Sequence, residues 1–178
     1  MNKNSITTPI PLLGFVAFSG TGKTTLLRKL LPLLTKENIR IGMIKHAHHT
    51  FDIDIPGKDS YELRKAGAVQ TIVCSQKRWA IITETPEQGT DPELQDMVNA
   101  LDASKLDLIL VEGFKHINFP KIELHRPSQG HPLLYIEDNN IIAIATDDTL
   151  SRQAEIPVLS INDPEEMTKF ILSFMQFS

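Results

Sequence analysis

The sequence has little that would tie the chain to secretion, to a membrane or to nucleic acid. Cys74 is its single cysteine, which excludes a disulfide framework within the chain. No apolar run approaches the ~20 residues that a membrane-spanning helix needs, and no signal-peptide pattern opens the chain. The net charge is −4 and the basic residues are scattered, so nucleic acid is not the expected partner. These absences favour a soluble cytoplasmic protein.

What the chain does contain is a strand–loop–helix motif near its start. An apolar run ends at Phe18, and the small residues of the segment SGTG follow it. Small residues let backbone N–H groups wrap closely around phosphate oxygens, so the segment predicts a phosphate-binding loop. Lys23 would neutralise the β- and γ-phosphates, and the Thr24 hydroxyl would bind Mg²⁺. The pattern G-x-x-x-x-G-K-[ST] is met except that Ala17 replaces the first glycine.

Apolar strand-like segments alternate with amphipathic ones along the rest of the sequence. This pattern predicts an α/β protein with the three-layer fold of P-loop NTPases. Strands are expected over residues 12–18, 39–45, 106–111, 121–125, 133–136, 141–145 and 157–160, and helices over 23–37, 61–65, 92–101 and 163–175. Segments 69–75 and 78–83 are separated by two residues, which predicts an antiparallel hairpin and therefore a mixed, mostly parallel sheet.

The helix ends and the domain boundaries follow from local signals. Pro32 should kink the first helix or end its regular part. Asp91 and Asp163 are expected to cap the third and the last helix. No linker or repeat is visible, so we expect one nucleotide-binding domain over residues 12–178, preceded by a flexible tail over residues 1–11.

Residues that follow the strands are candidates for chemistry, because ligands of open α/β sheets lie at the carboxyl ends of the strands. Glu112 closes an apolar strand as the acid of a Walker B strand does, so we expect it to bind Mg²⁺ together with Thr24. Asp107 is the other acid of this strand, but it should lie away from the phosphates. Gly113 could offer a backbone N–H to the γ-phosphate. Asp147 is a weak candidate for binding guanine, since no N-K-x-D motif accompanies it.

Three histidines follow the second strand and leave several interpretations open. His46, His48 and His49 could bind zinc, with nearby aspartates and the distant Cys74 as further ligands. They could instead face a phosphate or a pterin together with the hydrogen-bond donor Lys45, or lie in a solvated loop. Arg78, beside the hairpin turn, would either swing over a phosphate or stay in solvent.

Taken together, these segments resemble a known family. The segments GTGKTTLL, IKHAHH, DIDIPGKDSYELRKAGA, SQKRWAIITETP, LDLILVEGFKH and INDPEE are similar to the molybdopterin-guanine dinucleotide biosynthesis adaptor proteins. The resemblance implies a homodimeric GTP-binding P-loop protein with weak GTPase activity at most. It also implies cooperation with the guanylyltransferase that attaches GMP to molybdopterin, and molybdopterin itself is a further candidate ligand.

The resemblance also implies which residues face the nucleotide. Carried onto this sequence, these positions are Gly20, Thr21, Gly22, Lys23, Thr24 and Thr25 in the loop, then His48, His49, Thr50 and Phe51, then Arg78, and finally Gly113, Phe114, Lys115 and His116. The residues expected to bind Mg²⁺ are Thr24 and Glu112.

Two other functions compete with a GTP-dependent adaptor. A small-molecule kinase would use the same loop, but it needs an Arg-rich lid and a catalytic base, and neither is identifiable. A plain binding module would hold a phosphorylated pterin on the loop. No residue stands out as the group that positions an attacking water, so the catalytic residues stay unknown and we expect slow GTP hydrolysis.

Overall fold

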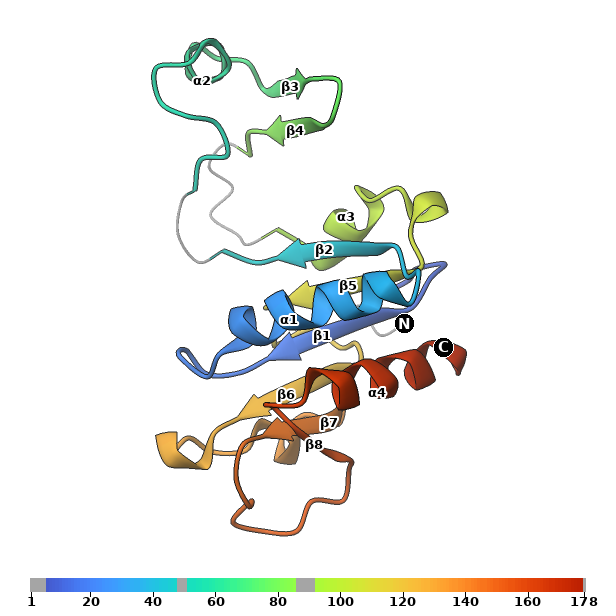
Figure 1. The fold of residues 1–178 in the computed structure, drawn as a ribbon. Coiled ribbons are helices and arrows are strands. Elements are labelled where there is room, and N and C mark those ends of the chain that lie inside the picture. The colour runs from blue at the N-terminus through green and yellow to red at the C-terminus, as the bar shows by residue number, and fades with distance from the viewer. Residues whose placement is uncertain (1–5, 48–50, 86–91, 178) are drawn as a thin grey trace. The chain divides into compact units, whose positions relative to one another are not determined.

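The structure, a computed structural model, describes residues 6–47, 51–85 and 92–177 of the 178-residue chain. The chain divides into two compact units (Figure 1). Unit 1 comprises residues 1–46 and 92–178, and unit 2 is the intervening segment of residues 47–91. The single domain expected over residues 12–178 stays a prediction.

Unit 1 is built on a six-stranded parallel sheet. The strands lie in the order β2 (Ile41–Lys45), β5 (Leu108–Glu112), β1 (Leu12–Val16), β6 (Lys121–His125), β7 (Ile141–Thr146) and β8 (Val158–Ser160). Every neighbouring pair runs parallel, so all carboxyl ends meet at one edge of the sheet (Figure 1). β1 and β6 are buried along their whole length, as strands covered on both faces must be.

Helices cover both faces of this sheet and complete three layers. α1 (Lys23–Lys36) and α4 (Pro164–Gln176) lie on the same face, where they bury one apolar cluster against the sheet. α3 (Leu94–Asn99) buries a second, smaller cluster with Ile109, Val111 and Phe119. The α/β three-layer P-loop NTPase fold is confirmed. None of the helices among the described residues is both long and apolar enough to cross a membrane.

The strand predicted over residues 133–136 is wrong. This segment contains η3 (Leu134–Ile136), a short 3₁₀ turn like η1 (Ala103–Lys105) and η2 (Pro127–Gln129). The buried Glu123 carboxylate accepts the backbone N–H groups of Leu134 and Tyr135 at 2.8 and 2.9 Å. Because a side chain binds these two donors, the backbone needs no neighbouring strand to satisfy them.

Several helix ends differ from the sequence expectations. α1 continues past Pro32 to Lys36, and Pro32 is exposed, where water can bind the carbonyl that proline leaves without an N–H donor. The N-cap residue of α3 is Glu93, whereas Asp91 lies outside the described residues. Asp163 caps α4 as expected, because its carboxylate accepts the N–H groups of Glu165 and Glu166 at 3.0 Å.

Part of the segment expected to be a flexible tail is docked on unit 1. Ile6 and Ile10 pack against the apolar cluster under α3. The side chain of Gln95 accepts the backbone N–H of Thr7 and donates to the carbonyl of Thr7, both at 2.9 Å. Residues 6–11 therefore help to cover the face of the sheet on which α3 lies, because their two isoleucines add to the apolar cluster there.

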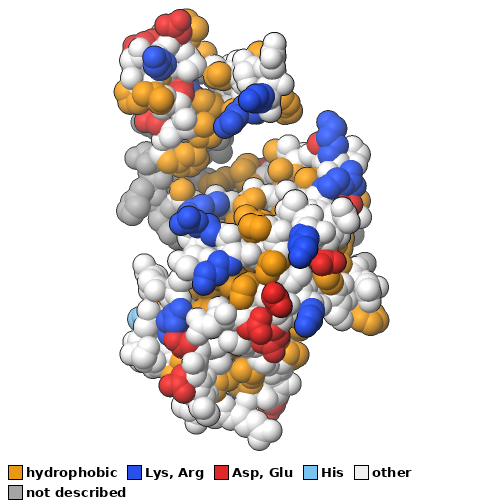
Figure 2. Space-filling view, in the orientation of Figure 1, with side chains coloured by type: hydrophobic (Ala, Val, Ile, Leu, Met, Phe, Trp, Pro, Cys, Tyr) orange, Lys and Arg blue, Asp and Glu red, His pale blue; other side chains and the backbone are white. Residues whose placement is uncertain are grey.

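Unit 2 contains α2 (Asp59–Lys65) and a two-stranded sheet of β3 (Gln70–Cys74) and β4 (Trp79–Thr83). The predicted antiparallel hairpin is confirmed, but it forms a sheet of its own, so the large sheet is purely parallel rather than mixed. Apolar side chains lie on the surface of this unit (Figure 2), among them Ile72 and Trp79, which are 61% and 67% exposed.

Candidate functional site

The predicted phosphate loop joins β1 to α1 at the carboxyl edge of the large sheet. Gly22 is the N-cap residue of α1 with φ of 104°, a left-handed conformation that glycine adopts readily. Lys23 follows as the first helical residue, and its Nζ donates to the carbonyl of Ala17 at 3.2 Å. The contact uses the backbone of Ala17 and requires no particular side chain there. Thr24 and Thr25 are exposed in the first helical turn.

Two lysines and one glutamate meet next to this loop. Glu112 ends β5 and is paired in register with Phe15 of β1 and Lys45 of β2. Lys45 Nζ lies 3.6 Å from Glu112 Oε2. Burial lowers the pKa of Lys23, the negative charge of Glu112 opposes this shift, and the charge of Lys45 adds to it. The group carries one net positive charge, which suits an anionic ligand.

The segment after Glu112 is shaped by a close contact with the end of β2. Gly113 has φ of 104°, and a Cβ atom there would lie 2.8 Å from the Cβ of His46. The His46 backbone N–H donates to the Glu112 carbonyl at 2.9 Å, and its ring stacks on Phe114 at 4.7 Å. Only glycine fits this position. The close approach places Phe114 beside His46, and Lys115 and His116 are exposed.

A buried lysine that the sequence analysis missed supports the same segment. Lys121 of β6 is 1% exposed, and its Nζ donates to the carbonyls of Lys115 and Ile117 at 3.2 and 2.7 Å. The Asp138 carboxylate lies 2.6 Å from the same nitrogen. All three ammonium protons therefore have acceptors, and the loop after β5 is tied to the centre of the sheet. The sequence did contain a signal for this residue, namely a lysine at the start of a predicted strand.

Two residues of the turn after β6 also lie against the phosphate loop, and the sequence analysis missed both. Arg126 donates from Nε to the carbonyl of Thr21 at 2.9 Å, and Gln129 contacts the Thr21 hydroxyl at 3.1 Å. The guanidinium of Arg126 also forms an ion pair with Asp147. The carboxylate that was a weak candidate for binding guanine is therefore engaged by an arginine.

Asp107 is not among the residues beside the phosphate loop. It precedes β5 at the opposite end of the strand and binds the guanidinium of Arg40 at 2.7 Å. The hydrogen bonds from the Arg40 side chain and backbone lower the pKa of Asp107 to about 2. The expectation that Asp107 lies away from the phosphate loop is confirmed.

The zinc interpretation gains no support from the residues that can be placed. His48, His49 and Thr50 lie outside the described residues. Among the residues that the structure does describe, no group of three or more His, Cys, Asp or Glu side chains could hold a metal ion. The two aspartates near the histidines, Asp52 and Asp54, bind Arg64 instead.

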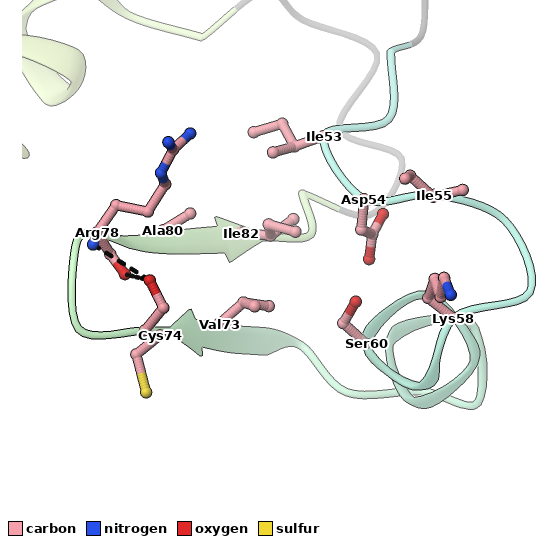
Figure 3. Close-up of a pocket in the computed structure, with 11 residues that line it drawn as sticks. Ile53, Asp54, Ile55, Lys58, Ser60, Val73, Cys74, Arg78, Ala80 and Ile82 are labelled. Atoms are coloured by element: carbon pink, nitrogen blue, oxygen red, sulfur yellow. Dashed lines mark hydrogen bonds between the residues drawn. The ribbon is translucent and has the colours of Figure 1, made fainter.

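Phe51 and Arg78 belong to unit 2, so their contact with a nucleotide stays a prediction. Phe51 is exposed. Arg78 lines a cavity of about 380 Å³ between the hairpin and the segment that leads into α2 (Figure 3). Most of the cavity wall is apolar, formed by Ile53, Ile55, Val73, Ala80 and Ile82.

The chain is similar in sequence to a protein family and to several of its members. Residues 12–147 match the family model of molybdopterin guanine dinucleotide synthesis protein B, MobB. The molybdopterin-guanine dinucleotide biosynthesis adapter protein of Escherichia coli K12 is 55% identical over 95% of both chains. The adapter protein of Haemophilus influenzae is 42% identical over 93% of this chain and 90% of its own length.

Solved structures agree with this assignment at the level of the fold. MobB of Bacillus subtilis superposes with a TM-score of 0.73 at 24% identity and covers 93% of this chain and 98% of that chain. A MobB homologue from Bacillus stearothermophilus gives a TM-score of 0.70 at 24% identity, with 94% and 99% covered. Since the family model spans most of the sequence and the closely similar relatives are aligned almost end to end, the chain belongs to the molybdopterin guanine dinucleotide synthesis protein B family.

Proposed function

We propose that this protein binds GTP with Mg²⁺ at the loop of residues 17–25 and acts as an adapter in the biosynthesis of molybdopterin-guanine dinucleotide. The observation that carries the proposal is the phosphate loop with Lys23, Lys45 and Glu112 beside it. The chain that contains this loop is 55% identical to an adapter protein over 95% of its length. The loop would hold the phosphates, and residues 113–116 would line the γ-phosphate side.

Thr24 and Glu112 would hold the magnesium ion. Both offer hard oxygen donors at the sheet edge where the loop begins, and Mg²⁺ in such sites takes few protein ligands besides phosphate and water. When bound, the ion would neutralise charge on the phosphate oxygens. Lys45 would share the Glu112 carboxylate with the ion.

Hydrolysis by the isolated protein is expected to be slow. Lys23 supplies one positive charge near the phosphates, and Arg126 is engaged by Thr21 and Asp147. A missing second cation costs ~10³–10⁵ in rate in related phosphoryl-transfer enzymes. Slow turnover suits an adapter that works with the guanylyltransferase in the cytoplasm, and the similar relatives are adapter proteins, which does not favour the alternative small-molecule kinase.

A homodimer is part of the proposal, and unit 2 offers the surface that supports it. Ile81 of the hairpin is 44% exposed and lies on the same face as the still more exposed Ile72 and Trp79. An isolated two-stranded sheet is marginally stable in water, so apolar strands of this kind gain from a partner surface. Trp79→Ser should shift the protein from dimer to monomer, as measured by sedimentation. Lys77→Ser at the hairpin turn is the control and should leave the dimer intact.

Nucleotide binding is tested by removing the charge of Lys23. Lys23→Ala should lose most of its affinity for GTP and keep its thermal unfolding temperature, because the side chain is not part of the apolar core. Lys29→Ala, an exposed lysine of the same helix, is the matched control. Calorimetry with GTP, ATP, GDP and a pterin phosphate distinguishes the proposed GTP-binding protein from a pterin-binding module. Unchanged GTP affinity in Lys23→Ala would show that the loop does not bind the nucleotide.

The metal and the turnover need two further measurements. Glu112→Gln should weaken GTP binding in Mg²⁺ more than in EDTA. An equal loss in both conditions would contradict a metal role.

Single-turnover GTP hydrolysis by the isolated protein should be slow, and its rate should change when the guanylyltransferase is added. Turnover by the isolated protein at ~1–10³ s⁻¹ would refute the adapter and favour a phosphotransferase.

A further inference from the structure

We propose that Arg126 and Gln129 are positioning residues that hold the phosphate loop in the conformation that accepts a nucleotide. The inference rests on the proposed nucleotide site but concerns residues outside the loop motif. Both side chains come from the turn after β6, more than a hundred positions along the chain from the loop residue that they contact, Thr21.

The contacts converge on one buried threonine. Thr21 is 2% exposed, and its hydroxyl lies 2.8 Å from the carbonyl of Phe18 and 3.1 Å from Oε1 of Gln129. Its single proton is therefore shared between an acceptor within the loop and one on the turn. On the backbone side, Arg126 Nε donates to the Thr21 carbonyl at 2.9 Å. Side chain and main chain of the same residue are thus both held from the turn.

Holding the Thr21 carbonyl also sets the direction of the next N–H group. In a trans peptide the carbonyl of one residue and the N–H of the next point in opposite directions. Arg126 draws the Thr21 carbonyl toward itself, so the Gly22 N–H must point away from the arginine. Gly22, with φ of 104°, has no side chain to resist rotation of this peptide. The arginine therefore supplies a restraint that the glycine cannot.

Asp147 fixes the arginine in turn. It follows β7 and pairs with Nη1 of Arg126, while Nη2 lies near Gly22, 3.7 Å from where a Cβ atom would be. The chain Asp147–Arg126–Thr21 links the ends of β7 and β6 to the loop after β1. Two of the arginine's nitrogens are occupied by these partners, which favours a positioning role over direct contact with the γ-phosphate.

The two roles make different predictions for GTP and GDP. Loop amides bind the phosphates that both nucleotides share, so a positioning residue affects both alike, whereas a γ-phosphate contact affects GTP alone. Arg126→Gln should weaken GTP and GDP by similar factors of about ten to a hundred, the usual range for losing a hydrogen bond from a charged group. Arg126→Lys should recover part of this loss. Arg152→Gln, an exposed arginine in the loop after β7, is the matched control and should bind like wild type.

A double-mutant cycle tests the link through Asp147. Asp147→Asn should weaken both nucleotides in the wild-type background and add little when combined with Arg126→Gln. Gln129→Ala should weaken both to a smaller extent, and it tests the same clamp if Arg126→Gln does not fold. Titration calorimetry and thermal unfolding are measured on each variant, since a merely structural residue would lower the unfolding temperature without changing the affinity of the folded protein.

The outcomes separate this inference from the function on which it rests. Loss of GTP affinity alone in Arg126→Gln, unchanged affinity for both nucleotides, or full additivity with Asp147→Asn would each overturn the positioning role. If folded wild-type protein binds neither GTP nor GDP, the proposed function itself fails. If wild type binds and Lys23→Ala does not, while Arg126→Gln binds normally, the function stands and this inference is wrong.

Discussion

Unit 1 and unit 2 are stabilised by different chemistry. Unit 1 buries two apolar clusters, one on each face of a six-stranded sheet. In unit 2, Arg64 is the one buried residue among those that the structure describes there, which are 47 and 51–85. Its guanidinium binds Asp52, Asp54 and Glu84 at 2.6 to 2.7 Å. One unit is organised around buried leucines and isoleucines, and the other around a single buried cation.

Unit 2 is a short segment that folds without an apolar core. A segment of this size buries too little apolar surface to offset its conformational entropy. Arg64 joins α2 to the segment before it and to Glu84 after β4, so three separate stretches are fixed by one side chain. The apolar side chains of unit 2 are then free to remain on its surface, where a partner can bury them.

The largest effect is expected from removing that cation. Arg64→Leu should unfold unit 2, because three carboxylates would be left close together without a counter-charge. Hydrogen exchange measured peptide by peptide should show amides of α2, β3 and β4 exchanging about a hundredfold faster or more, with unit 1 unchanged. Lys77→Leu, at the exposed hairpin turn, is the control. If unit 2 keeps its protection in Arg64→Leu, apolar contacts stabilise it after all.

Lys121 provides the same test for unit 1, where a buried cation is added to an apolar core. Lys121→Met should lower the free energy of unfolding by about 3–5 kcal/mol, because Asp138 loses its partner and two loop carbonyls lose their donor. The sheet should still fold, unlike unit 2 without Arg64. Denaturant titration measures the loss, and the double variant with Asp138→Asn should be less destabilised than Lys121→Met alone. A loss as large in the double variant would assign the effect to packing.

The networks around Arg64, Lys121 and Arg126 also mark the limit of prediction from the sequence. The phosphate loop, the strand before it, the hairpin and the Asp163 cap were predicted because each is a local pattern. Arg64, Lys121 and Arg126 were not, because their partners lie far along the chain or on other elements, and no local spacing signals them. The strand expected over residues 133–136 failed for the same reason: the buried Glu123, eleven residues before Leu134, binds its backbone.

Acid should affect unit 2 before unit 1. The hydrogen bonds from Arg64 hold the pKa of Asp54 below its usual value, although burial opposes the shift. A carboxyl with a depressed folded pKa stabilises the fold above its unfolded pKa of about 3.9 and loses this effect as the pH falls through the folded value. The protection of unit 2 amides, taken relative to their intrinsic exchange rate at each pH, should therefore fall as the pH drops below about 4. Asp107 and Asp138 of unit 1 also have lowered pKa values, but the apolar clusters that stabilise that unit do not titrate in this window.

The control for the acid experiment is the Arg64→Leu chain. Unit 2 of this variant should already be unfolded at neutral pH, so acid should cause no further loss of protection there. Equal acceleration in both units of the wild-type chain would show that general acid unfolding, rather than the Arg64 cluster, determines the response.

The smallest effect is expected at Arg40, which carries the same chemistry as Arg64 in an exposed position. Its guanidinium binds both oxygens of Asp107, at 2.7 and 2.9 Å, and its side chain is 56% exposed against 5% for Arg64. Water solvates both partners when an exposed pair separates, so little free energy is lost. Arg40→Gln should change the thermal unfolding temperature by about 2 °C or less. Arg40 is exposed and binds one carboxylate, whereas the buried Arg64 binds three, so the contrast measures burial and the number of partners together. A shift as large as that of Lys121→Met would mean that the Arg40–Asp107 pair, which joins the start of β2 to the start of β5, orders the sheet edge itself.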